Sequence, residues 1–224
     1  MLVSALKYPH KSHRKLIVLP DESEDLAELM GIIFGDGGIN NPWQLVISLN
    51  SIKDIVYSNY IINLLTKLFN IQTASRKRPN QNTLVLVCSS ISLVDFLISK
   101  GAVRGNKIAQ KINIPFWITQ KAEFKKAFIR GLVDTDGCLY YHSHEVKNKS
   151  LVNIGFCLTS LSDKLISSAA DIMSEFGIKP HIKDDNHRIY LYGEQNVIKY
   201  LHIFGSSNPR IYQKYTNWRD ARAV

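Results

Sequence analysis

Hydrophobic and polar positions alternate in several short runs that predict half-buried β-strands. In "QLVISLN" the apolar residues Leu45, Ile47 and Leu49 occupy one face, and the residues between them occupy the other. The run "VNIGFCLT", from Val152 to Thr159, alternates in the same way. A period of two is typical of strands that place one face on a core. Both runs are therefore expected to lie in sheets with one open face.

Between these strands the sequence predicts helices, and the order of elements repeats along the chain. Asp25–Asp36 and Lys121–Asp136 are predicted helices, and each is followed by two strands, a helix, two more strands and a short helix. The predicted strands lie at about 38–41, 44–49, 71–78, 83–88, 138–146, 151–159, 178–183 and 187–192. The other predicted helices are Ile52–Phe69, about 91–100, Ser162–Phe176 and about 194–204. The sequence thus predicts an α+β fold in which an αββαββα unit occurs twice, as halves 21–115 and 116–224 after a basic arm, 1–20.

Small residues form a stripe on each of the two leading helices. They recur every four positions, at Ala27, Gly31 and Gly35 and, 100 residues later, at Ala127, Gly131 and Thr135. A glycine in mid-helix costs about 1 kcal/mol relative to alanine, and close approach of two helix backbones is the usual compensation. We therefore expect the two helices to pack along these stripes. The alternative is that each helix packs only on its own sheet and that the repeat reflects duplication alone.

Packing of the two helices in the same direction would bring Asp36 and Asp136 together at their C-terminal ends. The partial negative charge of helix C-termini and the mutual repulsion of the carboxylates both disfavour this arrangement. A hard divalent cation with oxygen ligands would offset it. We therefore expect a Mg²⁺ site formed by Asp36 and Asp136, completed by the backbone carbonyls of Gly35 and Thr135.

The charge of the chain narrows the choice of partner. Lys and Arg number 28 against 19 Asp and Glu, for a net charge of +9. This balance favours a polyanionic partner, and the lack of a basic amphipathic helix favours nucleic acid over a membrane. No apolar run approaches the roughly 18 residues of a membrane span, and the N-terminus lacks a secretory signal. We expect an intracellular protein, in the cytoplasm or nucleoid of a prokaryote or in an organelle.

Two segments, "LMGIIFGDG" (Leu29–Gly37) and "IRGLVDTDG" (Ile129–Gly137), resemble the nine-residue signature of the LAGLIDADG homing endonucleases. Two copies with the same downstream elements resemble the single-chain, two-motif members of that family, over nearly the whole chain. The resemblance implies that the motif helices form the interface between the halves and that two antiparallel sheets form a saddle over the DNA major groove. It also implies that Asp36 and Asp136, at the eighth motif position, bind Mg²⁺, with Mn²⁺ or Ca²⁺ as substitutes for binding.

The sixth motif position departs from the pattern in the first copy, which has Phe34 where the second has Asp134. This position is variable in the family and is not a metal ligand. Asp134 is therefore expected to cap or pair locally.

The resemblance further implies a basic residue near each active centre, late in each half. Lys107 and Lys214 match this expectation, 71 and 78 residues after their aspartates. Each lysine could stabilise charge that develops on a phosphate, although a solvated surface charge is the alternative. Asn50 and Ser160, which end the second strand of each half, are candidates for ordering a water molecule.

Outward-facing polar and basic side chains on the predicted strands are candidates for DNA contacts. The candidates are Gln44, Ser48, Gln72, Arg76, Lys77, Arg78, Tyr141, Asn153, Lys179, His181, Lys183, Arg188, Tyr190 and Tyr192. Some of these would contact only phosphates, and a solvated sheet face is the alternative for each. In the N-terminal arm, Lys7, Lys11, Arg14 and Lys15 are further candidates for phosphate contacts.

These features predict a monomeric, site-specific endonuclease that hydrolyses one phosphodiester in each strand of a long, mostly non-palindromic DNA target. The resemblance implies that it is intron-encoded. The alternative is an RNA maturase that helps its host intron splice, but the presence of both acids favours the nuclease. A transcription regulator on the same scaffold usually carries an added helix-turn-helix domain, for which 224 residues leave no room. An intein-borne nuclease would need a splicing domain, which we also do not expect here.

Overall fold

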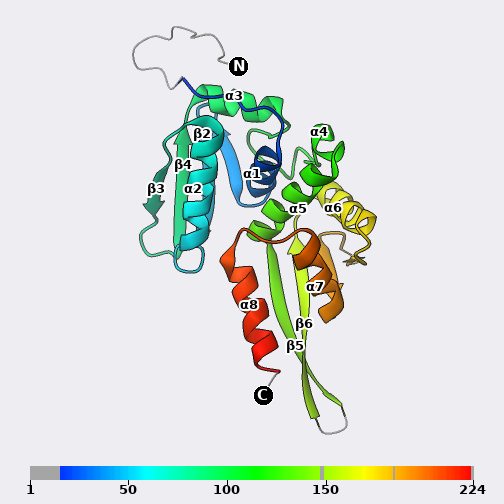
Figure 1. Ribbon diagram of the computed structural model, residues 1–224. Helices are drawn as coiled ribbons and strands as arrows, with labels where there is room; N and C mark the ends of the chain where they lie inside the picture. The colour runs from blue at the N-terminus through cyan, green and yellow to red at the C-terminus, as the bar shows by residue number, and fades with distance from the viewer. Residues whose placement is uncertain (1–15, 147–148, 184, 223–224) are drawn as a thin grey trace.

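The computed structural model describes residues 16–146, 149–183 and 185–222. The first half contains α1 (Glu24–Phe34), β1 (Gly37–Asn41), β2 (Gln44–Asn50), α2 (Ile55–Phe69), β3 (Ala74–Lys77), β4 (Thr83–Ser89) and α3 (Ile91–Ser99). The second half contains α4 (Phe116–Thr119), α5 (Ala122–Asp136), β5 (Gly137–Val146), β6 (Lys149–Thr159), α6 (Asp163–Glu175), β7 (His181–Ile182), β8 (Arg188–Tyr192), α7 (Glu194–Ile203) and α8 (Pro209–Asp220). Figure 1 shows these elements with α1 and α5 near the centre.

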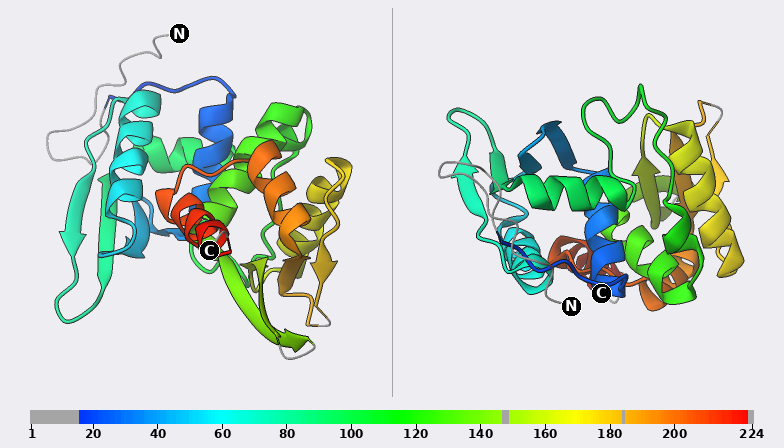
Figure 2. Two further views of the ribbon diagram at one scale, coloured as in Figure 1. Left: turned by 60° about the horizontal axis from the view of Figure 1, so that its bottom comes forward. Right: turned by 90° about the horizontal axis from the view of Figure 1, so that it is seen from above.

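The strands form two antiparallel sheets of the same topology. Their orders are β1-β2-β4-β3 and β5-β6-β8-β7. The two sheets lie on opposite sides of the central helices (Figure 2). The predicted α+β class and the duplicated ββαββ arrangement are confirmed.

Each sheet has one face on the core, as the alternation of apolar residues predicts. In β2 the side chains of Leu45, Ile47 and Leu49 are buried, and the residues between them are half-buried. In β6 the alternate residues Ile154, Phe156 and Leu158 are among the core residues. Among the described elements no helix covers the opposite face of either sheet, and we call these two surfaces the open faces.

The central helices α1 and α5 approach each other through their glycines. A Cβ atom on Gly31 would overlap the carbonyl oxygen of Phe128, and a Cβ atom on Gly131 would overlap that of Glu28. Phe128 and Glu28 occupy equivalent places in the two copies, so the contact is pseudo-symmetric. This result confirms that the small stripes face each other and excludes the alternative that each helix packs only on its own sheet.

Several boundaries differ from those expected, and two helices were not predicted. α1 ends at Phe34, whereas α5 continues to Asp136. The edge strands β3 and β7 are short, because only four and two of their residues pair with the neighbouring strand. The unpredicted α4 lies in the segment that joins the halves, and the unpredicted α8 follows α7.

The predicted N-terminal arm lies largely outside the described residues, and Lys7, Lys11, Arg14 and Lys15 are among those left out. The backbone of Val18 donates a hydrogen bond to the Phe69 carbonyl, so the chain just before α1 lies against the end of α2. Within the described ranges, no helix has the length and apolar character needed to cross a membrane.

Candidate functional site

Asp36 and Asp136 come together at the C-terminal ends of the central helices. A Cβ atom on Gly35 would lie 3.2 Å from the Asp136 Cγ, so the second carboxyl group sits beside the residue that precedes the first. Burial raises the pKa of Asp36 to about 6, with a further contribution from the Asp54 carboxylate. Burial also raises the pKa of Asp136 to about 7, and the charge of Asp36 adds to this effect. The two carboxyl groups therefore form an acidic pair whose negative charge is only partly offset by neighbouring cations.

Lys107 supplies part of the positive charge that offsets the Asp36 and Asp136 carboxylates. Its Nζ lies 3.1, 2.9, 2.5 and 2.7 Å from the carbonyl oxygens of Ile33, Phe34, Gly35 and Gly37, to which it donates. A cation is favourable at a helix C-terminus, where the last carbonyls lack intrahelical partners. The Lys107 charge lowers the pKa of both aspartates. The structure thus places Lys107 in the site, as expected from the sequence.

The Gly35 carbonyl, one of the two backbone ligands predicted for the metal, is less open than expected. The Gly35 carbonyl accepts a hydrogen bond from Lys107 at 2.5 Å, so this oxygen already faces a cation. The Thr135 hydroxyl donates to the carbonyls of Gly131 and Leu132 and is used within α5. The prediction that Gly35 and Thr135 complete a metal site therefore gains no support from their hydrogen bonds.

The carboxylate pair nevertheless fits a divalent cation such as Mg²⁺. Mg²⁺ is commonly held by one or two carboxylates together with water and substrate phosphate oxygens. Among the described residues no group of three or more His, Cys, Asp and Glu side chains could hold a metal ion. A pair of carboxylates is within the number of protein ligands that Mg²⁺ takes where phosphate oxygens and water complete its coordination.

α8 brings Arg210 close to Asp36, and the predicted Lys214 lines the adjoining groove, so its role near the active centre stays a prediction. The Arg210 charge lowers the pKa of Asp36, and its guanidinium pairs with Asp54 at 3.5 Å. The Lys214 Nζ lies 5.3 Å from the ring centroid of Tyr141 instead. The sequence signal for α8 was present, since Asn208 caps the helix, Pro209 is its first residue, and Ile211 and Trp218 recur on its buried side.

A groove of about 720 Å³ runs between α8, the first turn of α2 and the start of β5. Its lining includes the cationic side chains Lys53, Arg210 and Lys214. Cys138, two residues after Asp136, lines the same groove. The carboxylate pair therefore borders a basic depression that could accommodate phosphate groups.

Asn50 and Ser160 make local contacts at the turns where the second strands end. The Asn50 Oδ1 accepts hydrogen bonds of 2.9 Å from the backbone amides of Ile52 and Lys53. The Ser160 Oγ accepts a bond of 3.3 Å from the Ser162 amide. Both side chains stabilise the entry into the following helix, and their predicted role in ordering water remains a prediction.

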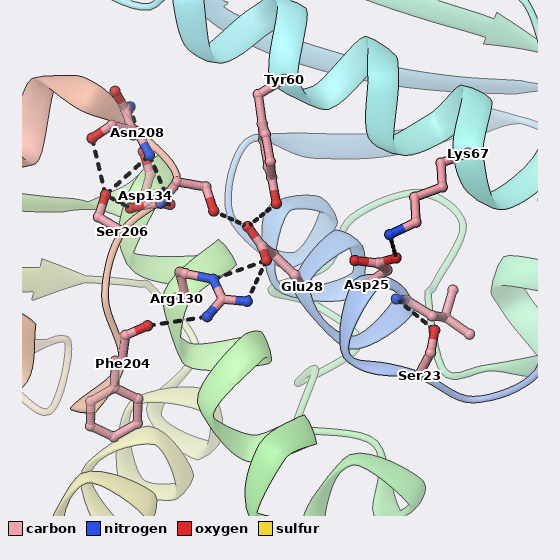
Figure 3. Close-up of polar contacts among 12 residues, drawn as sticks. Ser23, Asp25, Glu28, Tyr60, Lys67, Arg130, Asp134, Phe204, Ser206 and Asn208 are labelled. Carbon is pink, nitrogen blue, oxygen red and sulfur yellow. Dashed lines mark hydrogen bonds and ion pairs between the residues drawn. The ribbon is translucent and has the colours of Figure 1, made fainter. Parts of the chain in front are cut away.

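Sequence reasoning missed a buried acid that links the two halves, Glu28 of α1. Its Oε2 accepts bonds of 2.9 and 2.6 Å from the Arg130 guanidinium of α5. Its Oε1 accepts bonds from the hydroxyls of Tyr60 and Ser207, at 2.8 and 2.6 Å (Figure 3). A charged residue within an apolar motif helix must find a partner when it is buried, and this was the signal that could have identified it.

Asp134, at the variable sixth motif position, anchors the chain that leads into α8. Its carboxylate accepts hydrogen bonds from the Ser206 hydroxyl, the Ser207 amide at 2.7 Å and the Asn208 amide at 3.2 Å. The Asn208 side chain donates in return to the Asp134 carbonyl (Figure 3) and also to Asp54. Asp134 therefore pairs locally, as expected, and this pairing fixes α8 and Arg210 beside the acidic pair.

In the first sheet most predicted DNA-contacting residues lie on or beside the open face. Gln44 and Ser48 alternate with the buried side chains of β2, and Arg76 pairs with Val85 on the open side of β4. Gln72 and Arg78 are exposed and flank β3. Lys77 instead pairs with the buried Leu84 and faces the other way, so its predicted place on the open face is wrong.

In the second sheet one predicted contact, Tyr141, is on the wrong face. Tyr141 pairs with the buried Ile154, and its hydroxyl donates to the Lys214 carbonyl of α8 at 2.6 Å. The sequence-neighbour Tyr140 occupies the open face instead, because side chains alternate along a strand. The candidates that alternate with the core residues or are exposed at the edge strand are Asn153, Lys179, His181, Lys183, Arg188, Tyr190 and Tyr192.

Comparison with known proteins agrees with this geometry. Residues 123–216 match the family model of the LAGLIDADG-like domain. The chain therefore has the LAGLIDADG fold in its single-chain, two-motif form. No curated protein matches the sequence significantly.

Among solved structures, the homing endonuclease I-DmoI is similar, with 17% identity, a TM-score of 0.52 and coverage of 81% of this chain and 90% of that chain. I-DmoI in complex with DNA and Mn has 18% identity, a TM-score of 0.50 and coverage of 82% and 97%. Full-length DUF199/WhiA from Thermatoga maritima has 15% identity, a TM-score of 0.56 and coverage of 92% of this chain and 69% of that chain. Likeness at these identities shows the fold alone.

Proposed function

We propose that this protein is a Mg²⁺-dependent endonuclease that cuts both strands of a DNA target. The observation that carries the proposal is the meeting of Asp36 and Asp136 at the seam between the halves, beside a basic groove. Two buried carboxylates at helix C-termini are unfavourable without a cation, which supports a metal-dependent role. In the complex of I-DmoI the bound partners are DNA and Mn, and we extend this combination to the present chain as a proposal.

In the proposed reaction Asp36 and Asp136 hold the divalent ions between the halves. Bound metal would supply an activated water and neutralise charge on the phosphate. Lys107 favours the ionised form of both carboxylates, because its ammonium lowers the pKa of each. Arg210, which pairs with Asp54 at 3.5 Å, would donate hydrogen bonds to the phosphate, for which guanidinium geometry is well suited.

The open faces of the two sheets would bind DNA on either side of the cut. Polar residues there, such as Gln44, Arg76 and Asn153, would read bases or position the backbone. The two faces carry different side chains, so the target would be mostly non-palindromic. We further propose that the protein acts as a monomer inside the cell, with a long duplex as its partner.

A second candidate function is DNA binding without cleavage. The fold is shared by I-DmoI and by WhiA, a DNA-binding protein, and the match to full-length WhiA covers 92% of this chain. The Lys107 ammonium already donates to the Gly35 carbonyl and offsets part of the charge of Asp36 and Asp136, which would allow the seam to persist without a metal. The RNA maturase alternative remains a prediction from the sequence.

Selection of bound duplexes from a random pool tests the proposed function and identifies the target sequence in the same experiment. The pool is selected for binding in Ca²⁺, the enriched sequence is cloned, and the plasmid is then exposed to Mg²⁺. We expect linear DNA with one cut in each strand inside the enriched sequence. Enrichment of a sequence that stays intact in Mg²⁺ and in Mn²⁺ would instead support the second candidate.

A further inference from the structure

The open face of the second sheet carries a cluster of tyrosines that the core does not require. Tyr140 of β5 and Tyr190 and Tyr192 of β8 alternate with buried residues such as Leu139, Ile189 and Leu191. We call these three tyrosines the tyrosine platform. Tyr192 is 54% exposed, and Tyr140 and Tyr190 are half-buried. Their rings therefore lie on the side of the sheet that no described helix covers.

The rings of the tyrosine platform contact one another. Tyr190 and Tyr192 are parallel, with 5.6 Å between ring centroids and an interplanar angle of 3°. Tyr140 meets Tyr190 edge-on at 6.0 Å, and His181 of β7 lies 5.7 Å from Tyr192. Aromatic side chains from β5, β8 and β7 are thereby gathered into one area, with β6 between the first two of these strands.

Gly155 of β6 makes room for this arrangement. It pairs with Tyr140 on one side and with Tyr192 on the other. A Cβ atom on Gly155 would overlap the Tyr140 ring. The Tyr140 ring therefore lies over the glycine and extends the aromatic surface across the strand between β5 and β8.

The first sheet has the same topology, but its described residues form no such surface. The two sheets can be aligned through equivalent rows of paired residues, Gly37, Ile47 and Leu86 in the first sheet and Gly137, Leu158 and Ile189 in the second. In this alignment Val87 and Ser89 occupy the places of Tyr190 and Tyr192. By the same registers Asn41, which pairs with Gln44, takes the place of Tyr140, after a register shift in β1. The two open faces thus share one strand topology and differ in chemistry, which indicates that they bind different parts of a partner.

Aromatic ring faces suit unpaired bases better than paired ones. In a duplex both faces of each base are covered by its neighbours, so the grooves offer base edges and phosphates. An unpaired base has free faces and stacks readily on aromatic side chains, largely without regard to sequence. Exposed cations next to the platform, at Lys179 and Lys183 on either side of β7, would attract the backbone of a single strand.

We propose that the tyrosine platform binds an unpaired stretch of a DNA strand by stacking its bases. Tyr140 lies on the same strand as Asp136, four residues away, or about 14 Å at the usual rise of a β-strand. This inference rests on the proposed function for its choice of DNA, and it deepens that function. The preferred substrate is a duplex with a melted or branched segment over the second half.

Fluorescence anisotropy in EDTA tests the platform without any cleavage. The probes are a labelled single-stranded DNA 15-mer, its duplex, and an RNA 15-mer of the same sequence. Tyr190→Leu/Tyr192→Leu removes two rings but keeps apolar cover over the sheet, and Tyr190→Phe/Tyr192→Phe keeps the rings and removes the hydroxyls. Val87→Ala/Ser89→Ala at the equivalent places of the first sheet is the matched control.

We expect the wild-type protein to bind the single strand, and the leucine variant to bind it at least about tenfold more weakly for loss of stacking. The phenylalanine variant and the control should stay within about twofold of the wild type, and the leucine variant should lose less duplex binding than single-strand binding. Equal loss of duplex and single-strand binding in the leucine variant would overturn the proposal, as would loss in the phenylalanine variant. Tighter binding of the RNA than of the DNA strand would also overturn it. Since no metal is present, the result does not depend on whether the protein cuts DNA.

Discussion

At the scale of single residues, the structure is organised around buried charges that meet between the two halves. Asp36 and Asp136 meet at one end of the central helices, and Glu28 and Arg130 pair beside them. Burial makes each unpaired charge costly. The first group is only partly compensated by Lys107, whereas the second is fully hydrogen-bonded. The incomplete compensation marks the Asp36 and Asp136 pair as a candidate active site, and the complete pairing marks Glu28 and Arg130 as a structural contact.

The raised pKa values of the acidic pair predict that stability without metal falls as the pH rises. The native pKa values are about 6 for Asp36 and about 7 for Asp136, against an ordinary value of 3.8. The native state therefore holds protons that the unfolded state has released. The resulting stability is fully present below about pH 4 and is lost as the pH rises through 6 and 7. We expect the melting temperature in EDTA to fall between pH 5 and pH 8.

The double variant Asp36→Asn/Asp136→Asn should reduce the slope of this pH profile, since its amides do not titrate. Mg²⁺ should raise the melting temperature of the wild type at pH 8 and leave that of the double variant nearly unchanged. Burial also raises the pKa of Asp134 to about 7, so Asp134→Asn should remove its own share of the slope but keep the response to Mg²⁺. An unaltered slope in the double variant would contradict the account of this site.

Removal of the Arg130 side chain should strongly destabilise the protein. Arg130→Met leaves the Glu28 carboxylate, only 1% exposed, without its cationic partner. Loss of one partner of a buried ion pair costs about 3–5 kcal/mol, which chemical denaturation would measure. Lys67→Met, which removes the exposed partner of Asp25, should change stability little. Similar losses in both variants would show that the buried pair has no special role.

At the scale of elements, the contact between α1 and α5 determines how the two halves fit together. The glycines allow backbone contact, as Gly31 faces the Phe128 carbonyl and Gly131 faces the Glu28 carbonyl. Helices that touch in this way bring their last residues together, so the position of the acidic pair follows from the small-residue stripes. The loop Ser206–Asn208 then binds both helices through Glu28 and Asp134.

Gly31→Ala should therefore destabilise the protein by at least about 2 kcal/mol, because rigid backbone on the partner helix cannot yield to the added methyl group. An alanine in mid-helix is otherwise favourable by about 1 kcal/mol, so helix propensity alone predicts the opposite sign. Gly38→Ala in β1 is the control, since a Cβ atom there would meet no atom within 4 Å. Urea unfolding of both variants measures the difference. A stabilised Gly31→Ala variant would contradict close packing of the helices.

Much of this element arrangement could be predicted from sequence, because periodicity and repetition are local signals. The stripes of Gly31 and Gly131 predicted the helix pair, and the alternation in "QLVISLN" predicted the face of β2. The partners of Glu28 were not predictable, since Arg130 and Ser207 lie 102 and 179 residues away. The prediction for Tyr141 failed because the pattern of a strand does not show which of its faces a distant helix covers. Here α8 covers the face that carries Tyr141.

At the scale of the whole molecule, a pseudo-symmetric frame supports two unequal surfaces. The sheets share one topology, and the central helices contribute one carboxylate each. The first open face is polar and aliphatic, whereas the second carries the tyrosine platform. Such a molecule would hold an asymmetric DNA target with one fixed polarity, and the shared acidic pair would act where the halves meet.

Cleavage of a duplex selected for binding is the measurement that tests the central claim most directly. Wild type, Asp36→Asn and Asp136→Asn are compared on that duplex in Mg²⁺, with binding measured in parallel in Ca²⁺. We predict that the wild type cuts both strands, that each variant loses at least about a hundredfold in rate, and that all three proteins still bind the duplex. Cutting by either variant at the wild-type rate, or binding by the wild type with no cutting at all, would contradict a metal-dependent nuclease centred on these two carboxylates.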